Sequence, residues 1–168
     1  MTELEKKEYY ELEKEKERII QRQIELNPYI IIKNMNGKKF GESWSEKYVR
    51  SKVPNLHKNN GKGHDLKSPK YPLIELKSSR VDFEHGKWTM NQIHVQEADA
   101  FLFVWYDCNT GEQIISFMTT KQLCDECDRS PQHQADIDIC CTVSNTERNL
   151  KAMKRHKIAS WEKLNEVV

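Results

Sequence analysis

The first 26 residues combine dense charge with a thin apolar stripe, a pattern that predicts one long helix. Thr2 and Glu5 have the spacing of a capping box, which marks a helix start. Because the stripe is narrow, we expect this helix either to dock along the edge of the domain or to pair with another copy. Pro28 is its expected stop. The apolar positions recur every seven residues, at Leu12, Ile19 and Leu26.

The rest of the chain alternates between strand-like and helix-like patterns. The continuous apolar run over residues 101–106 is typical of a strand buried on both faces. This alternation indicates an α/β fold with a mixed central β-sheet flanked by helices and an N-terminal helical extension. Further strands are predicted over residues 29–33, 73–78, 114–119 and 139–144.

Helices are predicted over three later segments, and an acidic loop separates the last two of them. The helices cover residues 42–53, 89–98 and 146–166, and the loop covers residues 124–138. The core face of the last helix is expected to carry Leu150, Met153, Trp161 and Leu164.

The length of 168 residues and the hydrophobic content of 37% fit a single domain with its own core. No apolar run approaches the roughly 18 residues of a membrane span, and the N-terminus lacks a signal-peptide pattern. We therefore expect a cytoplasmic protein. Within the domain we distinguish the N-terminal helix (1–27), a catalytic core (40–120), and a cysteine-containing loop with the C-terminal helix (121–168).

Charge is strongly segregated along the chain although the formal net charge is only +1. Residues 1–26 carry a net charge of −2 and residues 27–96 carry +7, whereas residues 97–140 carry −7 and residues 141–168 carry +3. A nearly neutral total can hide a basic face. We expect such a face, built from the second and fourth blocks, to bind nucleic acid.

The most informative chemistry lies between residues 63 and 78. On a strand, Glu75 and Lys77 would emerge on the face opposite to the apolar residues around them. Asp65, on the neighbouring hairpin arm, would bring a second carboxylate to the same point. Two hard oxygen ligands suit Mg²⁺, and a lysine beside the metal can orient or deprotonate a water aimed at phosphorus.

The spacing of an acid and a lysine two residues apart is not specific by itself. With 26 acidic residues and 20 lysines in the chain, it is expected about three times by chance. Asp65 and Lys67 already repeat it. The context gives the motif its weight, because an apolar strand surrounds the pair and the upstream aspartate follows a glycine-rich loop. The alternative is a surface ion pair between Glu75 and Lys77 on a half-exposed strand.

This arrangement resembles the PD-(D/E)XK nuclease superfamily, and in particular small type II restriction endonucleases, over residues 42–106. The resemblance implies a restriction-endonuclease-like core in which Asp65 and Glu75 hold Mg²⁺, with Mn²⁺ as a substitute, and Lys77 supports the attacking water. It also implies an acidic residue from the preceding helix, with Glu46 as first choice and Glu42 as second. His64 stands where the family has a proline.

Polar and basic residues around the motif are candidates for DNA contacts. Arginine, asparagine and glutamine can make bidentate contacts to base edges, and lysine reaches phosphates. The alternative for each of them is an ordinary solvated surface position. The candidates are Lys58, Lys62, Ser78, Ser79, Arg80, Lys87, Asn91 and Gln92.

Cysteines near the C-terminal third approach the spacing of a zinc knuckle. A structural Zn²⁺ would staple the acidic loop, and buried thiols are the alternative. Adjacent cysteines diverge on a strand, which weakens the zinc interpretation. The ligand candidates are Cys124, Cys127, His133 and Cys140, with Cys141 as a replacement for Cys140.

Together these features predict a Mg²⁺-dependent endodeoxyribonuclease that cuts double-stranded DNA at a short site as a homodimer, as type II restriction enzymes do. Two sites related by a two-fold axis are needed to cut both strands of a palindrome. A cognate DNA methyltransferase would act on the same site. The alternatives are a structure-specific nuclease such as a Holliday-junction resolvase, and a non-catalytic nucleic-acid-binding module stabilised by zinc.

Overall fold

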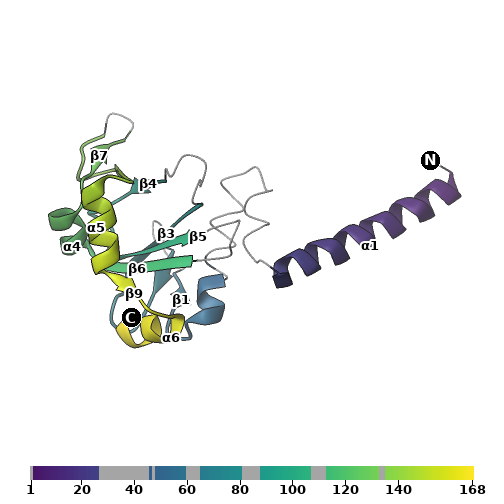
Figure 1. Ribbon diagram of the computed structural model, residues 1–168, viewed down its shortest axis with the longest axis horizontal. Coiled ribbons are helices and arrows are strands. Elements are labelled where there is room, and N and C mark those ends of the chain that lie inside the picture. Colours follow the sequence, from purple (N-terminus) through teal and green to yellow (C-terminus); the bar gives the residue numbers. More distant parts are fainter. Residues whose placement is uncertain are drawn as a thin grey trace.

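A computed structural model describes residues 2–26, 46, 48–59, 65–80, 88–106, 113–132 and 135–168. A six-stranded mixed sheet, in the order β1-β2-β3-β5-β6-β9, forms its centre (Figure 1). β3 and β5 are parallel and every other neighbouring pair is antiparallel. The strands are β1 (His57–Lys58), β2 (Leu66–Lys67), β3 (Ile74–Arg80), β5 (Ala100–Tyr106), β6 (Gln113–Thr119) and β9 (Lys157–Ile158).

The structure confirms three of the predicted strands and the mixed α/β class. β3, β5 and β6 cover the segments predicted over residues 73–78, 101–106 and 114–119. The strand predicted over residues 29–33 lies outside the described residues.

The central strand β5 separates two apolar cores. Leu102 and Val104 belong to the core on one face of the sheet. Phe101, Phe103 and Trp105 belong to the core on the other face. All five side chains are buried, which confirms the prediction of a strand buried on both faces.

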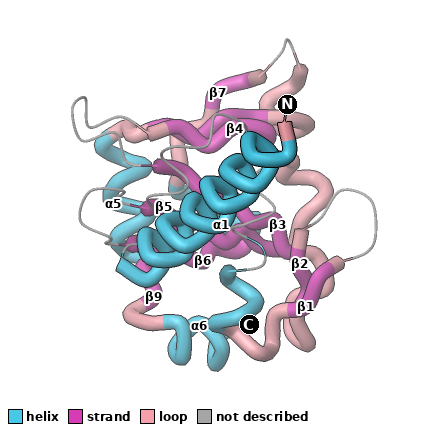
Figure 2. The backbone as a smooth tube through the Cα atoms, turned by 90° about the vertical axis from the view of Figure 1, so that its right-hand side faces the viewer, coloured by secondary structure: helices cyan, strands magenta, loops and turns pink. Residues whose placement is uncertain are grey.

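A second, three-stranded antiparallel sheet covers the face with the aromatic residues of β5. It consists of β4 (Thr89–Ile93), β8 (Cys141–Ser144) and β7 (Ser130–Pro131), in that order. β8 confirms the main part of the strand predicted over residues 139–144. Figures 1 and 2 show β4 and β7 above the six-stranded sheet and α6 (Trp161–Val167) below it.

The helix predicted over residues 89–98 is wrong, because this segment forms β4 followed by a turn. The sequence misled because Met90 and Ile93 are three residues apart, as on a helix face. In the structure a register shift between them adds one residue to the strand, so both side chains still enter the core. Gln92 absorbs the irregularity with a φ of 56°.

Helix α1 (Glu3–Leu26) matches the predicted N-terminal helix. Its start has the expected capping box, since the amide of Glu5 donates to Thr2 Oγ1 and the amide of Thr2 donates to the Glu5 carboxylate. The helix predicted over residues 42–53 is described at residue 46 and over residues 48–52, where it is helical. Within this helical segment, which ends at Lys52, Val49 is buried in the same core as Leu102.

The single helix predicted over residues 146–166 is wrong, because the structure has two helices there. α5 (Glu147–Arg155) and α6 are separated by β9, which pairs with β6. Met153 packs in one core, whereas Trp161 and Leu164 pack in the other. One straight helix could not reach both faces of the sheet. Leu150, placed on the core face by the sequence, is 40% exposed.

The prediction of a loop over residues 124–138 is also wrong in its first part. α4 (Thr120–Glu126) occupies the start of this segment, and β7 follows it. Thr119 caps α4 in a reciprocal capping box with Gln122. The backbone amide of Gln122 donates to Thr119 Oγ1 at 3.3 Å. Threonine and glutamine three residues apart are the sequence signal that identifies this helix start.

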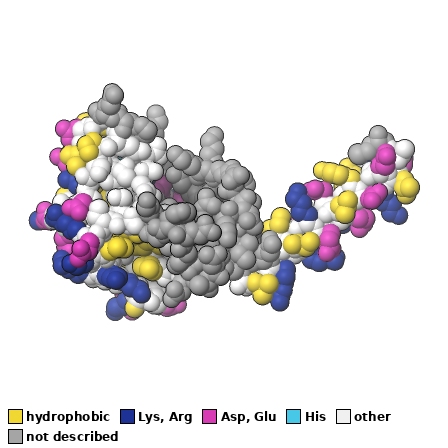
Figure 3. All heavy atoms as spheres, turned by 45° about the horizontal axis from the view of Figure 1, so that its top comes forward, with side chains coloured by type: hydrophobic (Ala, Val, Ile, Leu, Met, Phe, Trp, Pro, Cys, Tyr) yellow, Lys and Arg dark blue, Asp and Glu magenta, His cyan; other side chains and the backbone are white. Residues whose placement is uncertain are grey.

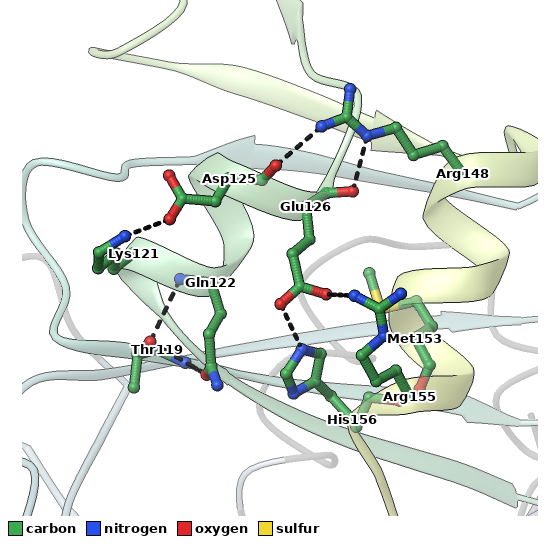
Figure 4. A network of polar contacts seen from close by, with 10 residues as sticks. Thr119, Lys121, Gln122, Asp125, Glu126, Arg148, Met153, Arg155 and His156 are labelled. Carbon is green, nitrogen blue, oxygen red and sulfur yellow. Dashed lines mark hydrogen bonds and ion pairs between the residues drawn. The ribbon is translucent and has the colours of Figure 1, made fainter.

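A network of charged side chains joins the end of α4 to α5 (Figure 4). Arg148 donates to the carbonyl oxygens of Asp125 and Glu126 at 2.8 and 3.0 Å, and so satisfies two free carbonyls at the C-terminus of α4. The Glu126 carboxylate contacts Arg155 at 2.7 Å and His156 Nε2 at 3.0 Å. The hydrogen bond with His156 holds the pKa of Glu126 below its ordinary value.

Asn149 ties the same region together from the inside. Its side chain is completely buried. Its amide nitrogen donates to the carbonyl oxygens of Asp128 and Ser144 at 2.9 and 2.7 Å, and its Oδ1 accepts from the amide of Asp128 at 2.7 Å. One side chain therefore satisfies three backbone groups in the segments that follow α4 and precede α5.

Replacing Asn149 by leucine, which has a similar volume, should lower the free energy of unfolding by about 2–4 kcal/mol. The substitution leaves buried backbone groups without partners, each of which costs about 1–3 kcal/mol. Urea unfolding monitored by circular dichroism measures the difference. Asn145→Leu, at a partly exposed position nearby, is the control and should cost less. Equal losses for the two variants would contradict the proposed role of Asn149.

Glu126→Gln should make the protein less sensitive to acid. The pKa of Glu126 is lower in the folded protein than its ordinary value of 4.5. The contribution of its ionised carboxylate to the free energy of unfolding is therefore complete above pH 4.5 and is lost as the pH falls through the pKa of the folded state. The melting temperature of the wild type should therefore fall more steeply than that of the variant between about pH 5 and 3. Glu147→Gln is the control, since its ion pair with Lys151 is exposed and contributes little. Parallel pH profiles for wild type and Glu126→Gln would be the contrary result.

Candidate active site on strand β3

Strand β3 presents alternate side chains to the two faces of the sheet, as its sequence predicts. Ile74 and Leu76 are buried in one core. Glu75 and Lys77 emerge on the other face, where Lys77 Nζ lies 2.6 Å from Glu75 Oε1. The two charged groups therefore form an ion pair on the same face of the sheet.

Asp65 reaches the same point from the neighbouring strand. β2 and β3 are antiparallel with Leu66 opposite Ile74, so Asp65, one residue earlier, lies next to Glu75. Asp65 Oδ2 accepts a hydrogen bond of 2.8 Å from the backbone amide of Leu76, the residue between Glu75 and Lys77. The structure thus brings together the three residues that the sequence singled out as a site.

The surroundings of the pair are largely apolar. Glu75 is level with Phe101 on β5, and Lys77 is level with Phe103. These rings form a stack that continues to Trp105, with centroids 6.0 and 6.1 Å apart. The exposed fractions of the side chains are only 9% for Glu75 and 13% for Lys77. In such surroundings charges interact more strongly than in water.

The burial corrects the alternative of a solvated surface ion pair, because neither partner is solvated. A nearly buried ion pair is also a poor means of stabilising a fold, since desolvation of both charges offsets their attraction. The pair and the neighbouring Asp65 therefore need a reason beyond stability, and we treat them as a candidate site.

The two carboxylates fit the expected magnesium ion. A carboxylate has about four accepting positions, and the hydrogen bond from Leu76 uses one of those of Asp65. Magnesium is commonly held by one or two carboxylates, with water and substrate phosphate completing its shell. Over the described part of the chain, no group of three or more His, Cys, Asp or Glu residues stands ready to hold a metal. At the candidate site, the protein ligands would be the two carboxylates of Asp65 and Glu75.

The position of Glu46 leaves its predicted role open. Its helical segment packs through Val49 and Val53 against the core on the face opposite to Glu75 and Lys77. Glu46 itself is partly buried and engaged in an interaction. Its participation in the site stays a prediction, and Glu42, the second choice, lies outside the described residues, as does His64.

Three of the candidate DNA contacts lie close to the site in the fold. Lys58 is exposed on β1, directly before Asn59, whose amide donates to the carbonyl oxygen of Asp65 at 3.1 Å. Ser78 and Ser79 continue β3, and Ser79 shares the face of Glu75 and Lys77. Arg80 ends the same strand, with its side chain outside the description, and Lys62 and Lys87 lie outside the described residues.

Asn91 and Gln92 lie on the outer face of β4 and not on a helix. Both are exposed, and the backbone amide of Gln92 donates to Gln132 Oε1 at 2.6 Å. Asn91 Oδ1 accepts from Thr142 Oγ1 at 3.1 Å. Gln92 is the one residue other than glycine with a positive φ among the described residues. Such backbone strain is concentrated at functional positions.

The acidic block of the chain is partly neutralised within the fold. Arg148 pairs with Asp128 at 3.3 Å, and Arg155 pairs with Glu126 at 2.7 Å. These two arginines belong to the basic fourth block, which we expected to join a nucleic-acid-binding face. Both side chains remain mostly exposed, so their place in such a face stays a prediction. The basic second block lies around β1, β2 and β3 and stays part of the predicted face.

Three of the candidate zinc ligands are buried thiols, Cys127, Cys140 and Cys141, whereas Cys124 is partly exposed, and the zinc site stays a prediction. The Arg129 side chain lies near Cys124 and Cys141. Burial raises the pKa of Cys127 to about 11. His133 lies outside the described residues. The cysteines in the described part of the chain are all free: Cys124, Cys127, Cys140 and Cys141.

Comparison with known proteins adds no assignment, because no family model and no curated protein matches the chain. None of the described helices combines the length and the apolar character needed to cross a membrane. The interpretation of the site therefore depends on its geometry.

The strained backbone at Gln92 can be tested by substitution. Gln92→Gly should be more stable than Gln92→Val by about 1–2 kcal/mol, because glycine adopts a positive φ freely and a β-branched residue does not. Chemical unfolding of both variants measures the difference. At the adjacent exposed position the order should reverse, with Asn91→Val more stable than Asn91→Gly, because Asn91 belongs to β4 and its φ is not positive. The same order at both positions would contradict the strain.

Proposed function

We propose that this protein is a Mg²⁺-dependent endodeoxyribonuclease with a restriction-endonuclease-like core, and that it hydrolyses double-stranded DNA at a short specific sequence. The observation that carries the proposal is the hydrogen bond from the Leu76 amide to Asp65. It brings a second carboxylate beside Glu75 and Lys77, and that combination of groups suits metal-assisted attack on a phosphodiester.

The residues have distinct roles in this proposal. Asp65 and Glu75 hold the metal ion through their carboxylate oxygens. When bound, magnesium neutralises charge that develops on the phosphoryl oxygens during hydrolysis. Leu76 contributes through its backbone, since its amide orients the Asp65 carboxylate.

Lys77 acts on the attacking water. Its ammonium group lies 2.6 Å from Glu75 Oε1. It is therefore held beside the position that a water bound near both carboxylates would occupy. The ammonium group can orient such a water through a hydrogen bond, and only after it has given up a proton could the neutral amine accept one from the water as the water attacks phosphorus. The aromatic stack of β5 beneath it limits access of bulk solvent and strengthens the local electrostatics.

DNA contacts are proposed around this point. Lys58 on β1 offers a charge for the phosphate backbone, and Ser78 and Ser79 offer hydroxyl groups along β3. Asn91 and Gln92 present amides from an exposed strand, and amides of this kind can read adenine in the major groove. The second sheet is thus the proposed recognition element, and β3 the proposed catalytic element.

The partners follow from the reaction. A type II enzyme that cuts both strands of a palindrome acts as a homodimer with one site in each subunit. A DNA methyltransferase of the same sequence specificity would protect the host DNA. Both partners are part of the proposal and follow from the proposed activity.

Plasmid cleavage tests the catalytic proposal directly. The wild type should cut DNA into discrete fragments with Mg²⁺ and should not cut with a chelator. Lys77→Ala should lower the single-turnover rate by about 10²–10⁴-fold, as loss of a group that manages the proton of the attacking water would. Fluorescence anisotropy with labelled DNA should show that this variant still binds.

Lys67→Ala is the matched control. Lys67 has the same spacing from Asp65 that Lys77 has from Glu75, but it is exposed on β2. Its loss should leave the single-turnover rate at saturating DNA unchanged, whatever its effect on DNA affinity. If neither Lys77→Ala nor Asp65→Asn differs from the wild type, or if no DNA is cut under any condition, the catalytic proposal is wrong. Cleavage confined to branched substrates would instead identify a structure-specific nuclease.

A further inference from the structure

Helix α1 carries apolar side chains that the described part of the chain leaves exposed. Its 24 residues extend away from the sheets and helices of the domain (Figure 1). Tyr9, Leu12, Ile19 and Leu26 are 51–68% exposed. In Figure 3 the apolar side chains are spaced along the helix between charged ones. Exposed apolar positions in a regular row mark an interaction surface.

These four residues occupy one seam of the helix. Steps of three and seven residues from Tyr9 place it at position a of a heptad and place Leu12, Ile19 and Leu26 at successive d positions. Residues 16 and 23 fill the other two a positions with a lysine and a glutamine. The seam therefore combines apolar d positions with polar a positions. Polar residues at a positions favour pairing with a single partner helix in a defined register.

We propose that α1 packs against α1 of a second copy of this chain, in antiparallel orientation. The seam is self-complementary in that orientation because Tyr9 meets Leu26 of the partner subunit, and Lys16 meets Ile19 of the partner subunit. Each lysine stem then covers an apolar residue while its ammonium group stays in water. Two-fold symmetry gives every such contact twice.

The charges beside the seam select the antiparallel orientation. In a parallel pair, a residue at g faces the e position five residues further on in the partner, so Glu8 would face Glu13 of the partner subunit and repel it. In the antiparallel pair, g positions face g positions. Glu15 then faces Arg22 of the partner subunit, and the symmetric copy repeats the attraction.

The ion pairs within α1 are compatible with this pairing. Glu15 contacts Arg18 at 3.0 Å and Arg22 contacts Glu25 at 2.9 Å, all with exposed side chains. Exposed pairs of this kind are weak and exchange easily. Their carboxylates and guanidinium groups are therefore able to take additional partners across the seam.

The pairing is independent of the nuclease proposal, because it concerns a surface that does not include β3. It can be measured without DNA, by sedimentation velocity of the full chain over a wide concentration range. We expect a reversible dimer. Leu12→Ala together with Ile19→Ala should raise the dimer dissociation constant about tenfold or more, while the helical propensity of alanine keeps α1 intact. A wild type that is monomeric at every concentration overturns the proposal, whatever else then binds α1.

Two controls establish whether the seam itself holds the two copies together. Lys14→Ala changes an exposed residue on the side of α1 opposite to the seam and should leave the dissociation constant unchanged. Circular dichroism of each variant confirms that the domain is folded. A dimer that is insensitive to the Leu12 and Ile19 substitutions would show that a different surface joins the copies and would also overturn the proposal.

Charge exchange tests the orientation. Glu15→Arg and Arg22→Glu should each weaken the dimer, because each places like charges across the seam. The double variant should recover most of the affinity, because the attraction is restored with its signs reversed. Simple addition of the two single effects would overturn the antiparallel register.

Discussion

The pairing of β3 with β5 is the constraint on which the rest of the structure depends. β5 is buried on both faces, so its side chains fill two separate cores and every neighbouring element must pack on one side or the other. β3, its parallel neighbour, has apolar residues for only one of these faces. Its other face therefore carries Glu75 and Lys77 beside the aromatic stack, and this is where the candidate site lies.

The candidate site was predictable from the sequence because it depends on short-range geometry. Glu75 and Lys77 share a face as a direct result of the two-residue period of a strand. Asp65 joins them through a hairpin only a few residues long, whose register puts it beside Glu75. The burial of the pair was not predictable, because it comes from β5 and from the second sheet, which are distant in sequence.

The wrong predictions have a common physical origin. Met90 and Ile93 have helical spacing, yet a bulge at Gln92 lets a strand bury both. The segment that continues α5 has helical spacing too, yet pairing of β9 with β6 interrupts it and sends Trp161 to the opposite core. In both cases contacts with a distant strand outweighed a local preference. Charge blocks that are separate in the sequence also meet in the fold, since Arg148 and Arg155 of α5 pair with Asp128 and Glu126.

The sequence by itself determined the α/β class, the long N-terminal helix, the doubly buried strand and the grouping of Asp65, Glu75 and Lys77. These features follow from periodicity and from turns between near neighbours, which any packing of the chain must respect. Only the tertiary structure decided that β4 is a strand, that the C-terminal helix divides in two and that the charged pair is nearly dry. Those outcomes depend on which of the two cores can accept each side chain, and that choice exists only once β5 is in place.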